Sequence, residues 1–189
     1  MLARLEDPTD QVAWERFDAR YRGMLIGFAR RLGLDLADAE EAAQRTLIAF
    51  CKAYREGKYD RDKGRFRHWL RGMARNEIAR LYKEKARQPL PVSQRSSLEA
   101  VLQLVRDPEP LTAIWEEQWQ AHIVRECLRR AAGHFSARDV EVFKRLMIEE
   151  QSVERITQAM DVSQHVVYHA KHRILAFMCS IQAELENVA

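Results

Sequence analysis

The chain has 189 residues, 47% of them hydrophobic and 31% charged, and carries a net charge of +3. This composition predicts a packed core and excludes a globally disordered chain, and the length allows one domain or two small ones. The 7 glycines and 5 prolines cluster outside the periodic segments, which favours an all-α fold. The pI of about 8.8 is too mild to indicate nucleic-acid binding, so any such signal has to come from local clusters of charge.

The cysteines and the N-terminus indicate a plain cytoplasmic protein. Cys51, Cys127 and Cys179 are far apart and form no C-x-x-C pair, so we expect reduced thiols, with neither a zinc site nor a redox pair. The first residues contain no apolar stretch of signal-peptide length, and no run approaches the length of a membrane span. We therefore expect no membrane association.

The first half of the chain is predicted to form long helices, because apolar residues recur there at the helical period. Gly33 and Gly57 are placed to end the first two helices, and Asp35 or Asp38 would cap the start of the second. The first helix divides into two shorter ones if packing demands it. These predicted helices cover residues 11–32, 36–55 and 65–83.

The helix predicted at 65–83 has an unusual charge pattern. Glu77 is its only acid, and residues 52–87 hold about thirteen Lys and Arg against about five Asp and Glu. A rigid face of one charge sign beside aromatic residues indicates a surface for phosphates and bases. Phe66 and Trp69 on the opposite stripe are expected to serve the core first, with base stacking as the alternative.

Two neighbouring features have a functional and a plain interpretation. Tyr59 lies in a charged loop, 56–64, where no core stripe requires it, so the loop is either a holder for an unstacked base or a solvated connector. The acids at the start of the helix at 36–55 either favour its dipole or form a docking face for a basic protein partner.

The second half is predicted to be helical after a linker marked by prolines and serines. A short helix at 98–105 is compatible with the linker. Gly133 is expected to end the first helix after it, and Ser136 to cap the next one. These helices cover residues 111–132, 136–149, 152–160 and 163–185. The expected domains are 1–86 and 111–189, joined by a linker at 87–110.

Residues 152–173 have the spacing of a helix-turn-helix, with an ordinary helical hairpin as the alternative. Ile156, Val162 and Val167 would form its small core, and Ser163 would cap the second helix. The side chains then expected to face the major groove are Gln164, His165, Tyr168, His169, Lys171 and His172, with Arg173 nearer a phosphate.

The histidines of this segment do not indicate a metal site. His165, His169 and His172 share one helix face, but no carboxylate or thiol completes a ligand set, so DNA readout or solvent exposure is preferred. We find no phosphate loop, nucleophilic triad or paired carboxylates, so the sequence does not indicate an enzyme and implies no cofactor.

Two segments carry a resemblance to a known family. Residues 38–54, followed by the pattern F-x-x-W-L-x-x-x-A-x-N from Phe66 to Asn76, resemble the second conserved domain of extracytoplasmic-function sigma factors. Residues 152–173 resemble the C-terminal helix-turn-helix domain of that family. The resemblance implies a bacterial transcription initiation factor that binds core RNA polymerase, directs it to promoter DNA and helps to open it. An anti-sigma factor is a further partner that the resemblance allows.

The resemblance also implies three sets of site residues, with the linker threading toward the active-site and RNA-exit channels of polymerase. Polymerase docking falls on Asp38, Glu40, Glu41, Gln44, Thr46 and Leu47. Recognition of the minus-ten element falls on Lys58, Tyr59, Arg61, Lys63, Arg65, Arg67, Arg71, Arg75, Asn76, Arg80 and Lys83. Recognition of the minus-thirty-five element falls on Ser163, Gln164, His165, Tyr168, His169, Lys171, His172 and Arg173.

The chain departs from the family pattern at several positions. Arg45 stands where an acid is usual, Ala170 where a base is frequent, and Thr157 and Asp161 replace a small residue and a glycine. Two other functions compete with the sigma factor. A repressor or activator that binds duplex DNA alone does not need the acidic docking face, and a purely protein-binding adaptor does not need a helix of one charge sign.

Overall fold

The computed structural model describes residues 2–7, 9–87 and 92–186. It confirms the all-α prediction, since the described residues form eight α-helices and two 3-10 helices and no strand. They divide into two compact units, Met1–Ala121 with Glu186–Ala189, and His122–Leu185. None of the described helices is long and apolar enough to cross a membrane.

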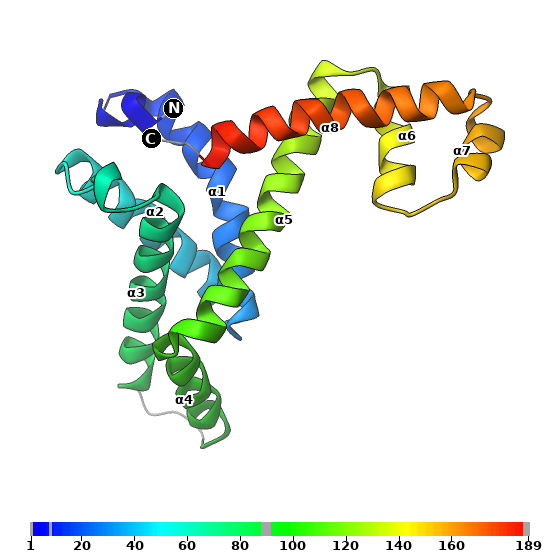
Figure 1. Ribbon diagram of the computed structural model, residues 1–189. Helices are drawn as coiled ribbons and strands as arrows, with labels where there is room; N and C mark the ends of the chain where they lie inside the picture. Colours follow the sequence, from blue (N-terminus) through cyan, green and yellow to red (C-terminus); the bar gives the residue numbers. More distant parts are fainter. Residues whose placement is uncertain (1, 8, 88–91, 187–189) are drawn as a thin grey trace. The chain divides into compact units, whose positions relative to one another are not determined.

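The helices lie close to the predicted ranges (Figure 1). The first unit contains η1 (Leu2–Glu6), α1 (Gln11–Arg31), α2 (Leu36–Arg55), η2 (Arg61–Lys63), α3 (Phe66–Ala86), α4 (Val92–Arg106) and the first part of α5 (Pro108–His134). The second unit contains the rest of α5 with α6 (Ala137–Met147), α7 (Val153–Met160) and α8 (Gln164–Glu186).

The helix ends in the first unit follow the local signals. Asp35 caps α2, because its side chain accepts a hydrogen bond from the backbone N–H of Asp38 at 2.8 Å. Gly33 and Gly57 follow α1 and α2 with φ angles of +96° and +66°, which favour glycine. Gly133 does not end α5 as predicted, because the helix continues to His134. α1 is a single helix.

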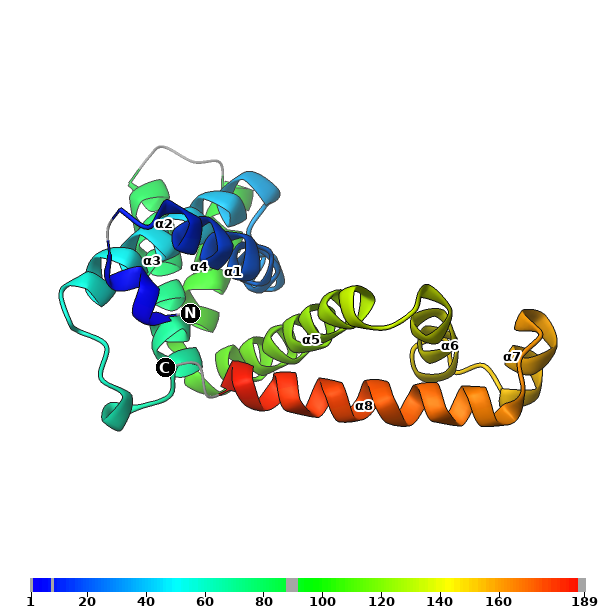
Figure 2. The same ribbon diagram turned by 90° about the horizontal axis from the view of Figure 1, so that it is seen from above.

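α1, α2 and α3 pack together (Figure 2), and aromatic side chains fill the core between them. Phe17 of α1 stacks on Phe50 of α2 with ring centroids 4.5 Å apart, and Phe66 of α3 meets Phe50 edge-on at 5.6 Å. All three rings are almost fully buried. Such pairs add to the burial of apolar area, so the three helices form a rigid support for the side chains on their outer faces.

The first part of α5 completes this core. Trp115 and Trp119 are almost fully buried. The ring centroid of Trp115 lies 5.0 Å from that of Phe28 of α1, and the ring centroid of Trp119 lies 6.2 Å from that of Tyr21 of α1. The two helices approach closely at Gly27, where an added Cβ would lie 2.5 Å from the Gln118 side-chain oxygen. A larger residue at position 27 would require the flexible end of the Gln118 side chain to move.

The compact units therefore divide between Ala121 and His122, inside α5. The predicted division at 87–110 followed the prolines and serines, but α4 and the start of α5 occupy most of that range. Pro108 and Pro110 lie in the first turn of α5, where a missing backbone N–H costs no intrahelical hydrogen bond. The assignment of polymerase docking and minus-ten recognition to the first domain, and of minus-thirty-five recognition to the second, stays a prediction.

The second unit has two small apolar clusters. Phe143 of α6 and Ile174 of α8 centre the first, and Ile156 of α7 and Val167 of α8 centre the second. Ala170, which departs from the family pattern, is 2% exposed in the second cluster. A basic side chain at this position would be buried among apolar groups, which explains the alanine.

Asp161 ends α7 in the left-handed conformation, with φ 50° and ψ 53°. This conformation disfavours a residue with a Cβ atom, so Asp161→Gly is expected to raise the free energy of unfolding of the second unit by about 0.5–1 kcal/mol. Thermal unfolding followed by circular dichroism would measure a rise of a few degrees. Asp161→Ala serves as the control and should lower the midpoint. A fall with glycine would contradict the prediction.

Candidate functional site

α2 carries a row of exposed side chains that winds gradually around the helix. Leu36, Glu40, Gln44 and Ile48 are spaced four residues apart and all four are exposed. Leu36 and Ile48 are 57% and 60% exposed, so both side chains are accessible to a partner. Glu40 and Gln44 belong to the predicted docking set, whereas Leu36 and Ile48 do not. Ile48 lies on the side of α2 opposite the core residues, which the helical period indicates, and Leu36 is the first residue of the helix.

Other residues predicted on this face lie elsewhere. Thr46 and Leu47 are 1% and 5% exposed, and the Thr46 hydroxyl donates a hydrogen bond to the Ala42 carbonyl at 2.7 Å. Asp38 is half-buried and forms an ion pair with Lys85 of α3. These three side chains face the core or α3, so α2 presents only part of the predicted set to a partner.

Arg45 has a structural partner on each side. Its guanidinium forms ion pairs with Glu41 of α2 at 2.7 Å and with Glu84 of α3 at 2.8 Å. The hydrogen bonds to these two carboxylates raise the pKa of Arg45. Arg45, the basic residue that departs from the family pattern, therefore links α2 to α3 and offsets the negative charge of Glu41.

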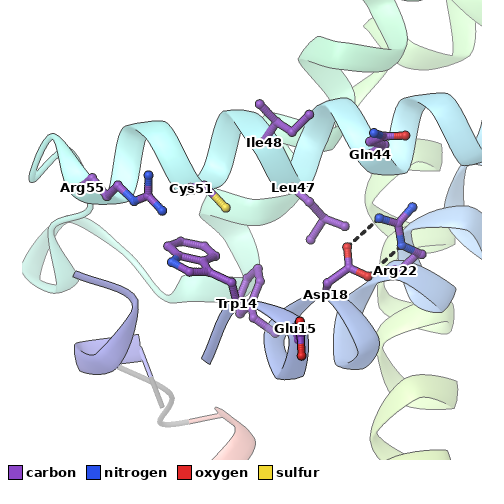
Figure 3. Close-up of a pocket in the computed structure, with 10 residues that line it drawn as sticks. Trp14, Glu15, Asp18, Arg22, Gln44, Leu47, Ile48, Cys51 and Arg55 are labelled. Carbon is purple, nitrogen blue, oxygen red and sulfur yellow. Dashed lines mark hydrogen bonds and ion pairs between the residues drawn. The ribbon is translucent and has the colours of Figure 1, made fainter. Parts of the chain in front are cut away.

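A groove of about 510 Å³ lies between α1 and α2, beside the row on α2 (Figure 3). Ile48 and Cys51 line one wall, and Trp14 of α1 lines the other, with the Arg55 guanidinium 4.9 Å from the tryptophan ring centroid. Burial raises the pKa of Cys51 to about 11. The thiol is therefore protonated at neutral pH and is a poor nucleophile.

The basic face of α3 is partly covered by α4 and α5. The Arg67 guanidinium pairs with Glu116 of α5 at 3.4 Å, and Arg71 donates a hydrogen bond to the Thr112 hydroxyl of α5 at 3.2 Å. Arg75 donates through Nε to the Val105 carbonyl of α4 at 2.8 Å. Each contact competes with a nucleic-acid phosphate for these donors.

The rest of the basic face is open to solvent. Arg80 is exposed and pairs with Glu77 at 2.9 Å on the same helix. Arg65, Asn76 and Lys83 are also exposed. The structure therefore divides the predicted basic set into side chains that contact α4 or α5 and side chains that remain available.

His68 lies among these cations. Burial lowers its pKa, and the positive charges of Arg67 and Arg71 lower it further. The imidazole is therefore neutral at pH 7 and adds no charge to the face.

The loop before α3 carries a half-buried tyrosine. Tyr59 packs against Trp69 of α3 with ring centroids 5.0 Å apart and lies 6.2 Å from the ring of Tyr54. Lys58 and Lys63 are exposed and pair with Glu56 and Asp60 at 2.6 and 2.9 Å. Arg61 begins η2, and its side chain lies outside the described residues. Tyr59 thus covers one edge of the aromatic core, and a base would have to share or replace that contact.

The start of α8 presents a polar face in the second unit. The exposed side chains among the predicted residues are Ser163, Gln164, His165, Tyr168, His169, His172 and Arg173. The rings of His165 and His169 stack at 5.7 Å. Lys171 is half-buried. In the described part of the chain, no group of three His, Cys, Asp or Glu side chains is placed to hold a metal ion.

Two members of this set have local structural contacts. Ser163 Oγ accepts a hydrogen bond from the backbone N–H of Val166 at 3.4 Å, which places it as a cap of α8. Arg173 pairs with Asp139 of α6 at 3.8 Å and lies 5.1 Å from the Phe135 ring centroid. Contact with DNA would therefore have to compete with α6 for Arg173.

The comparison with known families assigns the three-helix core. Residues 13–88 match the Sigma-70 region 2 family. The match covers α2 and α3 and almost all of α1. No curated protein matches the chain.

The matched domain, Sigma-70 region 2, is one of the domains of sigma-70 family sigma factors. Members of that family are transcription initiation factors without enzymatic activity, and they bind core RNA polymerase and promoter DNA. The row on α2 and the basic face of α3 both lie within the matched residues. α4, α5 and the second unit lie outside the matched residues.

Proposed function

We propose that the chain is an alternative sigma factor of the extracytoplasmic-function type, acting in the cytoplasm. The observation that carries the proposal is a region 2 whose two outer faces differ in charge and in chemistry. The α2 row combines one carboxylate and one amide with two apolar side chains, and the α3 face is basic. One domain with two such faces suits a protein that joins a polymerase to DNA. In this role the first unit reads the minus-ten element and the second unit the minus-thirty-five element.

We assign polymerase docking to the exposed row of α2. Glu40 and Gln44 supply the polar contacts, and Leu36 and Ile48 supply apolar anchors at either end. Interfaces gain most of their affinity from a few buried side chains of this kind. Thr46 and Leu47 support the row from inside, and Asp38 supports it through Lys85.

We assign minus-ten recognition first to the exposed part of α3 and its loop. Asn76, Arg80 and Lys83 are open to DNA in the structure, whereas Arg67 and Arg71 join once their contacts with α5 are exchanged for phosphates. Tyr59 and Trp69 form a half-buried ring pair on which an unstacked base can stack. No covalent chemistry is needed, since captured bases favour the open strands.

We assign minus-thirty-five recognition to the start of α8. The short α7, the left-handed Asp161 and the capped α8 match the order expected of a helix-turn-helix, and polar side chains face outward from α8. His165, His169 and Gln164 then read base edges. An anti-sigma factor would act by covering one of these surfaces.

Reconstituted transcription tests the proposal. The full chain mixed with core polymerase and genomic fragments is expected to yield transcripts with defined start sites, because polymerase alone does not select promoters. Mapping the 5′ ends of the transcripts would measure this. Polymerase without the chain is the control.

The same assay separates the competing functions. A repressor would bind duplex sites tightly without polymerase, and an adaptor would show no salt-dependent DNA binding. Folded protein that yields no start site on any fragment would refute the proposal.

A further inference from the structure

A small pocket lies between α3 and α4, away from the α2 row and the Tyr59 loop. Its volume is about 210 Å³, below the roughly 300–1,000 Å³ of sites for drug-sized ligands, but several times the ~30 Å³ share of one water molecule. The lining residues are Arg75, Asn76, Ala79, Lys83, Leu102, Val105 and Arg106. The pocket thus suits a compact group better than a whole nucleoside.

The pocket is lined by positively charged side chains that are not neutralised by nearby carboxylates of the described residues. Arg75, Lys83 and Arg106 line it, and no carboxylate does. None of the three forms an ion pair with any residue in the described ranges 2–7, 9–87 and 92–186, whereas Arg67 and Arg80 of the same helix pair with acids. Like charges on one concavity repel one another, and a bound anion relieves that repulsion.

The donors are also held in place. Arg75 uses Nε for the Val105 carbonyl at 2.8 Å, which fixes the guanidinium at the pocket and leaves its Nη groups to donate to a ligand. Asn76 adds an exposed amide, and Leu102 and Val105 provide an apolar wall. An apolar wall lowers the local dielectric, which strengthens each charged hydrogen bond.

We propose that this pocket binds a phosphate group, and that the phosphate belongs to the backbone of promoter DNA. The DNA part rests on the proposed function. Arg106 belongs to α4, in the range predicted as linker, so α4 is part of the nucleic-acid surface of the first unit. The DNA strand bound to Asn76 on α3 would then continue over the pocket between α3 and α4.

Arg106→Gln in the full chain tests the site. Binding of a fluorescent forked DNA is measured by anisotropy over a range of salt concentrations. The slope of log affinity against log salt should fall by about 0.7–0.9, the contribution of one phosphate contact. Arg16→Gln on α1 is the matched control, because Arg16 is also exposed and the charge change is the same. Its slope should stay at the wild-type value.

Pyrophosphate tests the chemistry of the pocket without DNA. Titration calorimetry should show saturable binding to the wild-type chain and to Arg16→Gln, but not to Arg106→Gln. Pyrophosphate binding with an unchanged DNA slope would overturn the assignment to DNA and leave a site for a free phosphate compound. No pyrophosphate binding and equal slopes in both variants would overturn the proposal entirely. The transcription assay is independent, so failure of either proposal is distinguishable.

Discussion

Trp119→Ala is expected to lower the free energy of unfolding of the first unit by about 3–5 kcal/mol. The indole is 1% exposed and lies against Tyr21 and Phe66, with ring centroids 6.2 and 6.4 Å away. Its removal leaves a cavity in the aromatic core that α1 and α3 share. Chemical denaturation with hydrogen exchange read on α1–α3 peptides would measure the loss in this unit separately from the other.

Val124→Ala is the control for this prediction. Val124 belongs to the same helix but is 43% exposed, so the change should stay within about 0.5 kcal/mol. Equal effects of the two substitutions would show that the start of α5 does not belong to the core in solution. The first unit would then end before α5, closer to the predicted domain boundary at 87–110.

Glu40→Lys is expected to weaken the binding of core polymerase by about 10- to 100-fold, or roughly 1.4–2.7 kcal/mol. Glu40 is exposed in the middle of the α2 row, so the substitution leaves the core intact. It places a like charge against a basic partner surface. Competition with labelled wild-type chain for core polymerase would measure the loss.

Glu6→Lys is the matched control for docking. Glu6 is exposed in η1, outside the row, and the substitution changes the net charge by the same amount. Its polymerase affinity should remain close to wild type, and both variants should keep their thermal stability. If Glu40→Lys also keeps wild-type affinity, the row on α2 is not the docking face.

Much of the fold follows from local signals in the sequence. The helical period placed α2 within its observed bounds, and Asp35, Ser136 and Ser152 cap the helices that they precede. Asp161 adopts the left-handed conformation that its place in the turn demands. These features depend on neighbours within a few residues, so the sequence alone determines them.

The tertiary structure decided which surfaces are free. Periodicity marks the apolar stripe of a helix, but the residue on its border is buried or exposed according to the helix that packs there. Thr46 is buried for this reason, and the basic face of α3 is shared with α5 through Arg67 and Arg71.

The role of residues 92–121 was also beyond local reasoning. Prolines and serines indicated a linker, yet two tryptophans beyond them are buried against α1, and α4 closes a basic pocket on α3. The sequence by itself determined the helices, their caps and the concentration of basic side chains on α3. Only the tertiary structure decided that Arg67, Arg71 and Arg75 are held, because their partners are contributed by helices 30 to 50 residues away along the chain.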